Sequence, residues 1–320
     1  MEYFTFDEIL EKAEAGEIEA QYVLGNIYYK GEGANQDYAK AIEWYRKAGI
    51  QGHADAQFTL GHMYYFGEGV EQDYVKALEW YEKATVQGYA KAQFSLGYMY
   101  YFGEGVAQDN IKALEWFKKA ANQGLAAAQS QLGYMYYSGE GIPPDIIKAL
   151  EWYEKAAIQE YAKAQYCLGL MYEKGEGVKQ DYAKVQEWFE KAAANGIPNA
   201  QYDLGLLYYK GEGVPQDLIK AKEWFEKAAE QGHSKAQHNI GVMYYRGEGV
   251  SQDLIKAKEW LEKAAEQGHT DSQCALGVMY DVGYGVNQDY AKAKEYYKQA
   301  CDNGNQRGCD AYEDLIKQGH

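Results

Sequence analysis

The sequence predicts an all-α fold, an α-solenoid superhelix of eight 36-residue helix-loop-helix repeats with a half-repeat cap at each end. Two observations predict it. The pattern Gly-x-Gly recurs every 36 residues, with its first glycine at Gly31, Gly67, Gly103, Gly139, Gly175, Gly211, Gly247 and Gly283. The segments on either side carry apolar residues at helical spacing. A fixed period of this length indicates one repeat array rather than several globular domains.

The first segment of each repeat is predicted to be a helix with one buried face. In residues 54–67, Ala56, Leu60 and Met63 fall on a single apolar stripe when successive residues are placed 100° apart. Glycine fills the position of Gly61 in all eight repeats, although an internal glycine costs a helix about 1 kcal/mol relative to alanine. We interpret this glycine as the site of a close backbone crossing.

A glycine turn is predicted to join the first helix to the second. In GEGVEQD, Gly67 is expected to end the first helix in a left-handed conformation, Gly69 to reverse the chain and Asp73 to cap the next helix. A phosphate loop would follow a strand, and a calcium loop would need more oxygen ligands. The acids of the turn are expected to add to the outer charge.

The second helix follows each turn and repeats the pattern of small and aromatic residues, as in Ala77, Tyr81 and Ala84. All seven tryptophans occupy one position beside its core face: Trp44, Trp80, Trp116, Trp152, Trp188, Trp224 and Trp260. The eighth repeat carries Tyr296 there. This row is predicted to pack between repeats rather than to contact a ligand.

The repeat array is expected to form one solenoid over residues 1–320. Residues 1–16 read as an N-terminal capping helix, residues 17–304 as eight repeats and residues 305–320 as a C-terminal capping helix. Terminal units depart from the repeat pattern because one of their faces meets water.

The charge and hydropathy of the chain exclude several classes of partner. Its 48 acids and 32 bases give a formal charge of -16, which opposes binding to nucleic acid or anionic lipid. No segment approaches the roughly 20 apolar residues of a membrane span, and the first residues lack the features of a signal peptide. A cytoplasmic protein is expected, with a periplasmic or secreted location open if a leader was removed.

The repeat resembles the Sel-one-like repeat family, which is related to the tetratricopeptide repeats. The likeness rests on these residues of the second repeat: Ala56, Leu60, Gly61, Tyr64, Gly67, Gly69, Val70, Asp73, Lys76, Ala77, Trp80, Lys83, Ala84 and Gly88. It implies an α-solenoid that acts as an adaptor or scaffold in protein-protein interaction. Some cysteine-rich members of that family are described as binding or hydrolysing β-lactams. The resemblance therefore also implies β-lactam binding or hydrolysis as an alternative function.

The face of the first helix that lies opposite the core stripe is predicted to line a concave, tyrosine-rich groove. Its aromatic residues are suited to bind a peptide or protein segment, and its later lysines suggest a partner with apolar and acidic residues. The alternative is that the tyrosines pack between first helices and the lysines are ordinary solvated residues. A monomer is expected. The predicted groove consists of Tyr22, Tyr29, Phe58, His62, Tyr65, Phe66, Phe94, Tyr98, Tyr101, Phe102, Tyr134, Tyr137, Lys163, Tyr166, Lys174, Tyr202, Tyr209, Lys210, Lys235, His238, Tyr245 and Arg246.

No residue pattern points to catalysis, and a non-catalytic protein is expected. No serine is followed at the third position by lysine, as the SxxK nucleophile of β-lactam enzymes requires. The six histidines lack metal-ligand spacing, so no metal and no cofactor are expected. A β-lactam hydrolase and a self-assembling structural repeat protein remain the alternative functions.

Four cysteines occur, and two of them match the spacing found in the cysteine-rich members of the family. By that resemblance, Cys301 and Cys309 would form a disulfide at the C-terminal cap in an oxidising compartment. In a reducing cytoplasm they would stay thiols, and the two other cysteines, Cys167 and Cys274, favour that alternative.

Overall fold

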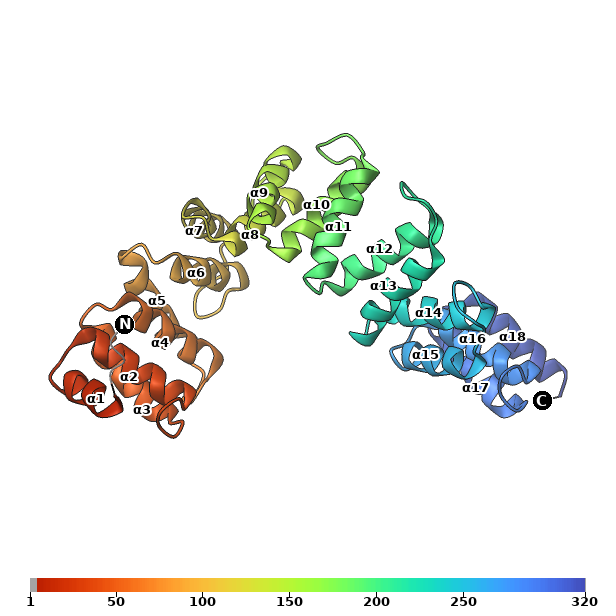
Figure 1. The fold of residues 1–320 in the computed structure, drawn as a ribbon, viewed down its shortest axis with the longest axis horizontal. Coiled ribbons are helices and arrows are strands. Elements are labelled where there is room, and N and C mark those ends of the chain that lie inside the picture. The colour runs from red at the N-terminus through yellow and green to blue at the C-terminus, as the bar shows by residue number, and fades with distance from the viewer. Residues whose placement is uncertain (1–4, 320) are drawn as a thin grey trace. The chain divides into compact units, whose positions relative to one another are not determined.

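A computed structural model describes residues 5–319, which form eighteen α-helices and no strand (Figure 1). The all-α prediction is confirmed. Residues 1–4 of the predicted N-terminal cap and residue 320 of the predicted C-terminal cap lie outside the described part. The chain divides into two compact units, residues 1–161 and residues 162–320, and each is treated by itself.

Both units are built from helix pairs, in which even-numbered helices are the first and odd-numbered helices the second. The first unit contains α1 (Phe6–Glu14), α2 (Ile18–Lys30), α3 (Tyr38–Ile50), α4 (Ala54–Phe66), α5 (Tyr74–Val86), α6 (Ala90–Phe102), α7 (Asn110–Asn122), α8 (Ala126–Ser138) and α9 (Ile146–Ile158). The second unit contains α10 (Ala162–Lys174), α11 (Tyr182–Ala194), α12 (Pro198–Lys210), α13 (Leu218–Glu230), α14 (Ser234–Arg246), α15 (Leu254–Glu266), α16 (Thr270–Val282), α17 (Tyr290–Asp302) and α18 (Gln306–Lys317).

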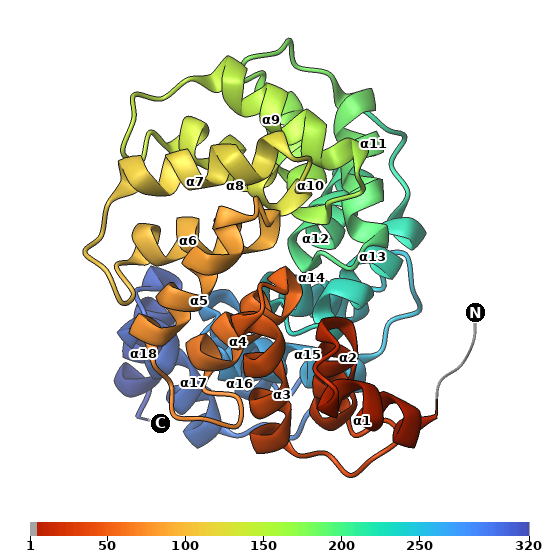
Figure 2. The ribbon, with the colours of Figure 1, turned by 90° about the vertical axis from the view of Figure 1, so that its left-hand side faces the viewer.

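Within each unit, a first helix packs against the second helix of its own pair and against the second helix of the preceding pair (Figure 2). The predicted apolar stripe forms the core, since Ala56, Leu60 and Met63 are fully buried. Because every pair uses both of its sides in this way, each unit is an α-solenoid.

The glycine turn has the predicted geometry. Gly67 ends α4 with φ of 73°, in the left-handed region that glycine adopts without strain. The Asp73 side chain accepts a hydrogen bond from the backbone N–H of Lys76 at 3.0 Å and so caps α5. In addition, Gln72 Nε2 donates to the Tyr65 carbonyl at 2.8 Å, which supplies a partner to the last turn of α4. The turn prediction is confirmed.

The invariant glycine of the first helix has a different cause from the one we inferred. A Cβ atom on Gly61 would lie 2.5 Å from Cδ1 of Tyr81, so the nearest obstacle to a side chain is an aromatic ring of the second helix and not its backbone. The same ring position meets the glycine in the other repeats, with Leu261 taking the place of the aromatic residue against Gly241.

The tryptophan row packs between repeats, as predicted. Trp80 is buried, and its ring lies 3.2 Å from a Cβ built on Gly49 of the preceding pair. The lysine three residues later covers the ring, with Lys83 Nζ 4.0 Å from its centroid. All seven tryptophans carry a lysine in this way, at 3.7 to 4.3 Å.

A buried glutamine joins the turns of successive repeats, and the sequence analysis did not single it out. Gln57 Nε2 donates to the Gly49 carbonyl at 2.8 Å, and its Oε1 accepts from Gln87 Nε2 at 2.9 Å. The glutamine stands in all eight repeats and is buried in each: Gln21, Gln57, Gln93, Gln129, Gln165, Gln201, Gln237 and Gln273. Buried amides with both functions satisfied fix the register of neighbouring repeats.

At the C-terminal end, a disulfide joins Cys301 at the end of α17 to Cys309 in α18. It links the last second helix to the cap helix. Within residues 5–319, no helix combines the length and the apolar character that a membrane crossing requires.

We expect Gly97→Ala to destabilise the protein, because the added Cβ would lie 2.5 Å from the buried Phe117 ring. Overpacking costs about 1–3 kcal/mol, which exceeds the roughly 1 kcal/mol that alanine gains in a helix. Urea unfolding followed by circular dichroism measures the change. Gly241→Ala is the matched control, since the nearest atom there is 2.9 Å away on the more flexible Leu261. Equal losses in the two variants would contradict the ring explanation.

We expect Glu160→Gly to stabilise the protein. Glu160 has φ of 61° and is the only residue other than glycine with a positive φ among the described residues, whereas the equivalent turns use glycine. A left-handed conformation costs a non-glycine residue roughly 1–2 kcal/mol, so the urea midpoint should rise. Glu160→Gln removes the same charge without freeing the backbone, and an equal rise with glutamine would show that charge is the cause.

Candidate protein-binding groove

All residues of the predicted groove lie on first helices, from α2 to α14, and each is half-buried or exposed. They differ in what they contact. Some meet in an aromatic cavity, others hold the next repeat in place, and the cations of the second unit lie beside acids.

An aromatic cavity of about 270 Å³ opens between α4 and α6 in the first unit. Six predicted residues line it: His62, Tyr65, Phe66, Phe94, Tyr98 and Phe102. Tyr81 and Ser95 complete the lining, and the sequence analysis had not assigned them to the groove. Tyr81 belongs to the second helix, so a search along the faces of the first helix could not find it.

The rings around this cavity contact one another within each of the two first helices. Tyr98 and Phe102 are parallel with centroids 5.8 Å apart, and Phe94 meets Tyr98 edge-on at 4.7 Å. Phe66 lies 4.5 Å from the His62 ring. Phe66 and Phe102 are nevertheless 57% and 58% exposed. Large apolar side chains that are exposed together beside a cavity are typical of interaction sites.

One tyrosine row has a structural role that the sequence analysis offered only as the alternative. Four of its hydroxyls donate to the glutamate of the next glycine loop, 39 residues later, as Tyr29 does to Glu68 at 2.7 Å and Tyr209 to Glu248 at 2.7 Å. Tyr65 bonds Glu104 and Tyr101 bonds Glu140 in the same way. These loop glutamates therefore have a structural contact that the sequence analysis did not assign to them, beyond the outer charge that it expected.

The contact changes the chemistry of the hydroxyl. The hydrogen bond to Glu68, with burial adding to it, raises the pKa of Tyr29 to about 12. The hydroxyl therefore stays protonated and remains a donor at neutral pH. Where the loop glutamate is replaced by Tyr284, the row residue Tyr245 meets its ring edge-on at 5.3 Å.

A second row of predicted residues packs against the turn that opens the next repeat. Tyr22 stacks on His53 with ring centroids 4.3 Å apart, and Tyr202 stacks on His233 at 4.6 Å. His238 lies 4.6 Å from His269, and burial lowers the pKa of His238 to about 4. His238 is therefore neutral at pH 7 and adds no positive charge to the groove.

The cations of the second unit lie beside acids, which makes this surface mixed in sign. Lys210 Nζ is 3.5 Å from Glu212, and Arg246 is 3.5 Å from Glu248. Glu173 and Asp203 add carboxylates, and burial raises the pKa of both. Lys163 and Lys235 are exposed and form no ion pair within residues 5–319.

Within the described residues, no group of three or more His, Cys, Asp or Glu side chains could hold a metal ion. The first unit presents aromatic rings beside a small cavity, which suits it to contact with an apolar side chain. The second unit presents charged side chains of both signs.

Comparison with known proteins locates the repeats independently. The family model described as Sel1 repeat matches the chain at residues 18–53, 54–89, 90–125, 126–161, 162–197, 198–233, 234–269 and 270–305. These segments cover the eight glycine loops. Proteins of this family generally serve as scaffolds for protein interaction.

Two solved structures are similar along nearly the whole chain. A protective antigen of uropathogenic Escherichia coli strains that displays an SLR fold is 36% identical, with a TM-score of 0.90, over 99% of this chain and 68% of that chain. A Sel1 repeat protein from Oxalobacter formigenes is 34% identical, with a TM-score of 0.71, over 97% and 89%. None of the curated proteins matches significantly. With eight repeat matches and two relatives above 30% identity, the chain belongs to the Sel1 repeat family.

Proposed function

We propose that this protein is a non-catalytic adaptor that binds an apolar segment of a protein partner in the aromatic cavity between α4 and α6. The observation that carries the proposal is the exposure of Phe66 and Phe102, at 57% and 58%, directly beside that cavity. In a soluble repeat domain, such rings lose contact with water when a partner covers them, which contributes about 25 cal/mol per Å² of apolar surface.

Binding would work by rigid display. The Tyr98 and Phe102 rings support each other in parallel, and Tyr65 is held by its bond to Glu104. Because these side chains are already fixed, they lose little conformational entropy when a partner docks. A single apolar side chain of the partner would enter the cavity while neighbouring residues cover the exposed rings.

The charge distribution supports a partner that also carries acids. Lys163 and Lys235 are exposed in the second unit and lack an ion pair within residues 5–319. Carboxylates of the partner would be attracted to them, while the overall charge of -16 disfavours a strongly acidic ligand elsewhere on the chain. We therefore propose that acidic residues of a partner bind at these lysines of the second unit, as a contact distinct from the apolar one in the first unit.

The proposal leaves two alternatives from the sequence analysis, and no contact among residues 5–319 favours either of them. A β-lactam hydrolase would turn over nitrocefin and lose that activity on substitution of one serine. A self-assembling structural protein would grow in mass with concentration in light scattering.

We expect Phe66→Ala combined with Phe102→Ala to weaken peptide binding at least tenfold, which corresponds to about 1.4 kcal/mol. Peptides selected from a displayed random library against the unmodified protein supply the probes, and fluorescence anisotropy gives Kd. Both rings are more than half exposed, so circular dichroism should show unchanged helix content. Tyr65 and Tyr101 are less suitable targets, because their hydroxyls hold the next loops.

Ile111→Ala is the matched control for this experiment. Ile111 is an apolar residue of α7 that is 62% exposed but lies outside the cavity, so its loss should change Kd less than twofold. Equal binding by the double variant, or equal weakening by the control, would refute the assignment of the cavity.

A further inference from the structure

The eighth repeat departs from the other seven at the tryptophan position. In those seven repeats, the lysine three residues after the tryptophan places its ammonium group 3.7 to 4.3 Å from the ring centroid. In the eighth, the ring belongs to Tyr296, and residue 299 is glutamine. The helix α17 therefore supplies no cation at the position where every other repeat has one.

The neighbouring cation of the same repeat is retained. Lys292 Nζ lies 5.1 Å from the Tyr280 ring, as the corresponding Lys76 lies 5.4 Å from Tyr64. Tyr280 stacks on one side of Tyr296 with centroids 5.8 Å apart. On this face of the eighth repeat, the indole and the cation that would cover it are replaced, while the cation over Tyr280 is kept.

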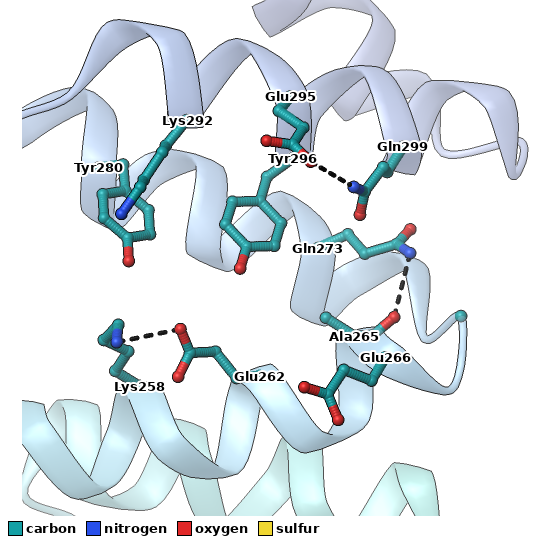
Figure 3. A pocket seen from close by; sticks show the side chains of 11 residues that line it. Lys258, Glu262, Ala265, Glu266, Gln273, Tyr280, Lys292, Glu295, Tyr296 and Gln299 are labelled. Carbon is teal, nitrogen blue, oxygen red and sulfur yellow. Dashed lines mark hydrogen bonds and ion pairs between the residues drawn. The ribbon is translucent and has the colours of Figure 1, made fainter.

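A cavity of about 590 Å³ lies where the indole is missing, between α15 and α17. In the second repeat, the Trp80 ring reaches Gly49 of the preceding pair. The counterpart of Gly49 is Ala265, which lines the cavity. The phenol ring of Tyr296 lines this cavity and has no lysine over it. Figure 3 shows the Tyr296 ring pointing from α17 toward Glu262 on α15.

The lining has an excess of negative charge. Three carboxylates, of Glu262, Glu266 and Glu295, face two ammonium groups, those of Lys258 and Lys292. Lys258 forms an ion pair with Glu262 at 3.0 Å, and the ammonium group of Lys292 lies over the Tyr280 ring. Glu295 accepts only a neutral hydrogen bond, from Gln299 at 3.3 Å, and Glu266 has no ion pair within the described residues.

We propose that this cavity binds the guanidinium group of an arginine on a partner protein. A guanidinium is planar, stacks on an aromatic face and pairs with carboxylates through two hydrogen bonds. It would cover Tyr296 as a lysine covers each tryptophan, and Glu266 and Glu295 would neutralise its charge. This cavity shares no lining residue with the aromatic cavity between α4 and α6, so it could bind a partner whether or not that cavity does.

The test uses the full chain and a fluorescein-labelled peptide, acetyl-Gly-Arg-Gly-Arg-Gly, with a citrulline peptide of the same length as neutral control. Anisotropy titrations at physiological salt give Kd. We expect the arginine peptide to bind at least fivefold more tightly than the citrulline peptide. Absence of binding up to 1 mM, or equal binding of the two peptides, would overturn the proposal.

The decisive variant restores the pattern of the other repeats. Tyr296→Trp with Gln299→Lys should place an internal cation over the ring at position 296, where the guanidinium would stack, so Kd for the arginine peptide should rise at least fivefold while thermal stability is kept. Val86→Lys adds the same charge at a residue of the first unit that is 88% exposed, and Kd should change less than twofold. Equal weakening in both variants would show that binding is only a response to net charge.

Discussion

The contact between a helical glycine and a ring of the facing helix is the constraint on which the rest of this structure depends. At Gly61 the ring of Tyr81 occupies the space that a Cβ would need, and the arrangement recurs in each pair. It sets how closely the two helices approach. With this contact repeated from pair to pair, side chains 30 or 39 residues apart come into hydrogen-bonding range again and again, as Gln87 with Gln57 and Tyr29 with Glu68.

A rigid frame of this kind lets surface positions change without loss of the fold. Phe102 and Lys174 occupy equivalent ends of first helices, and one is an exposed apolar ring while the other is an exposed cation beside Glu176. Tyr296 shows the same freedom on a second helix, where it takes the tryptophan position and lines a cavity. Residues that could recognise a partner therefore lie at exposed positions that vary between repeats. The glycine, leucine and alanine positions are buried and serve packing.

The glycine loop contributes to this frame in more ways than a simple turn. Its glutamine supplies a donor to the preceding helix, its aspartate caps the following helix and its glutamate holds a tyrosine of the preceding repeat. Three polar residues in seven thus satisfy groups from two repeats. The tyrosines that donate to these glutamates hold neighbouring repeats together. Phe66 and Phe102 form no such bond and are more than half exposed, so they are the groove residues best placed to contact a partner.

The sequence by itself determined the all-α class, the eight repeats, the helix caps and the buried stripe, because these follow from the period and from contacts between residues close in the chain. It also located six of the eight residues that line the aromatic cavity. Only the tertiary structure decided that Tyr81 fills the space above Gly61, that Glu68 turns toward Tyr29 and that Gln57 joins two repeats. Each of these depends on the distance between helices, and helical periodicity fixes the direction of a side chain but not what stands opposite it.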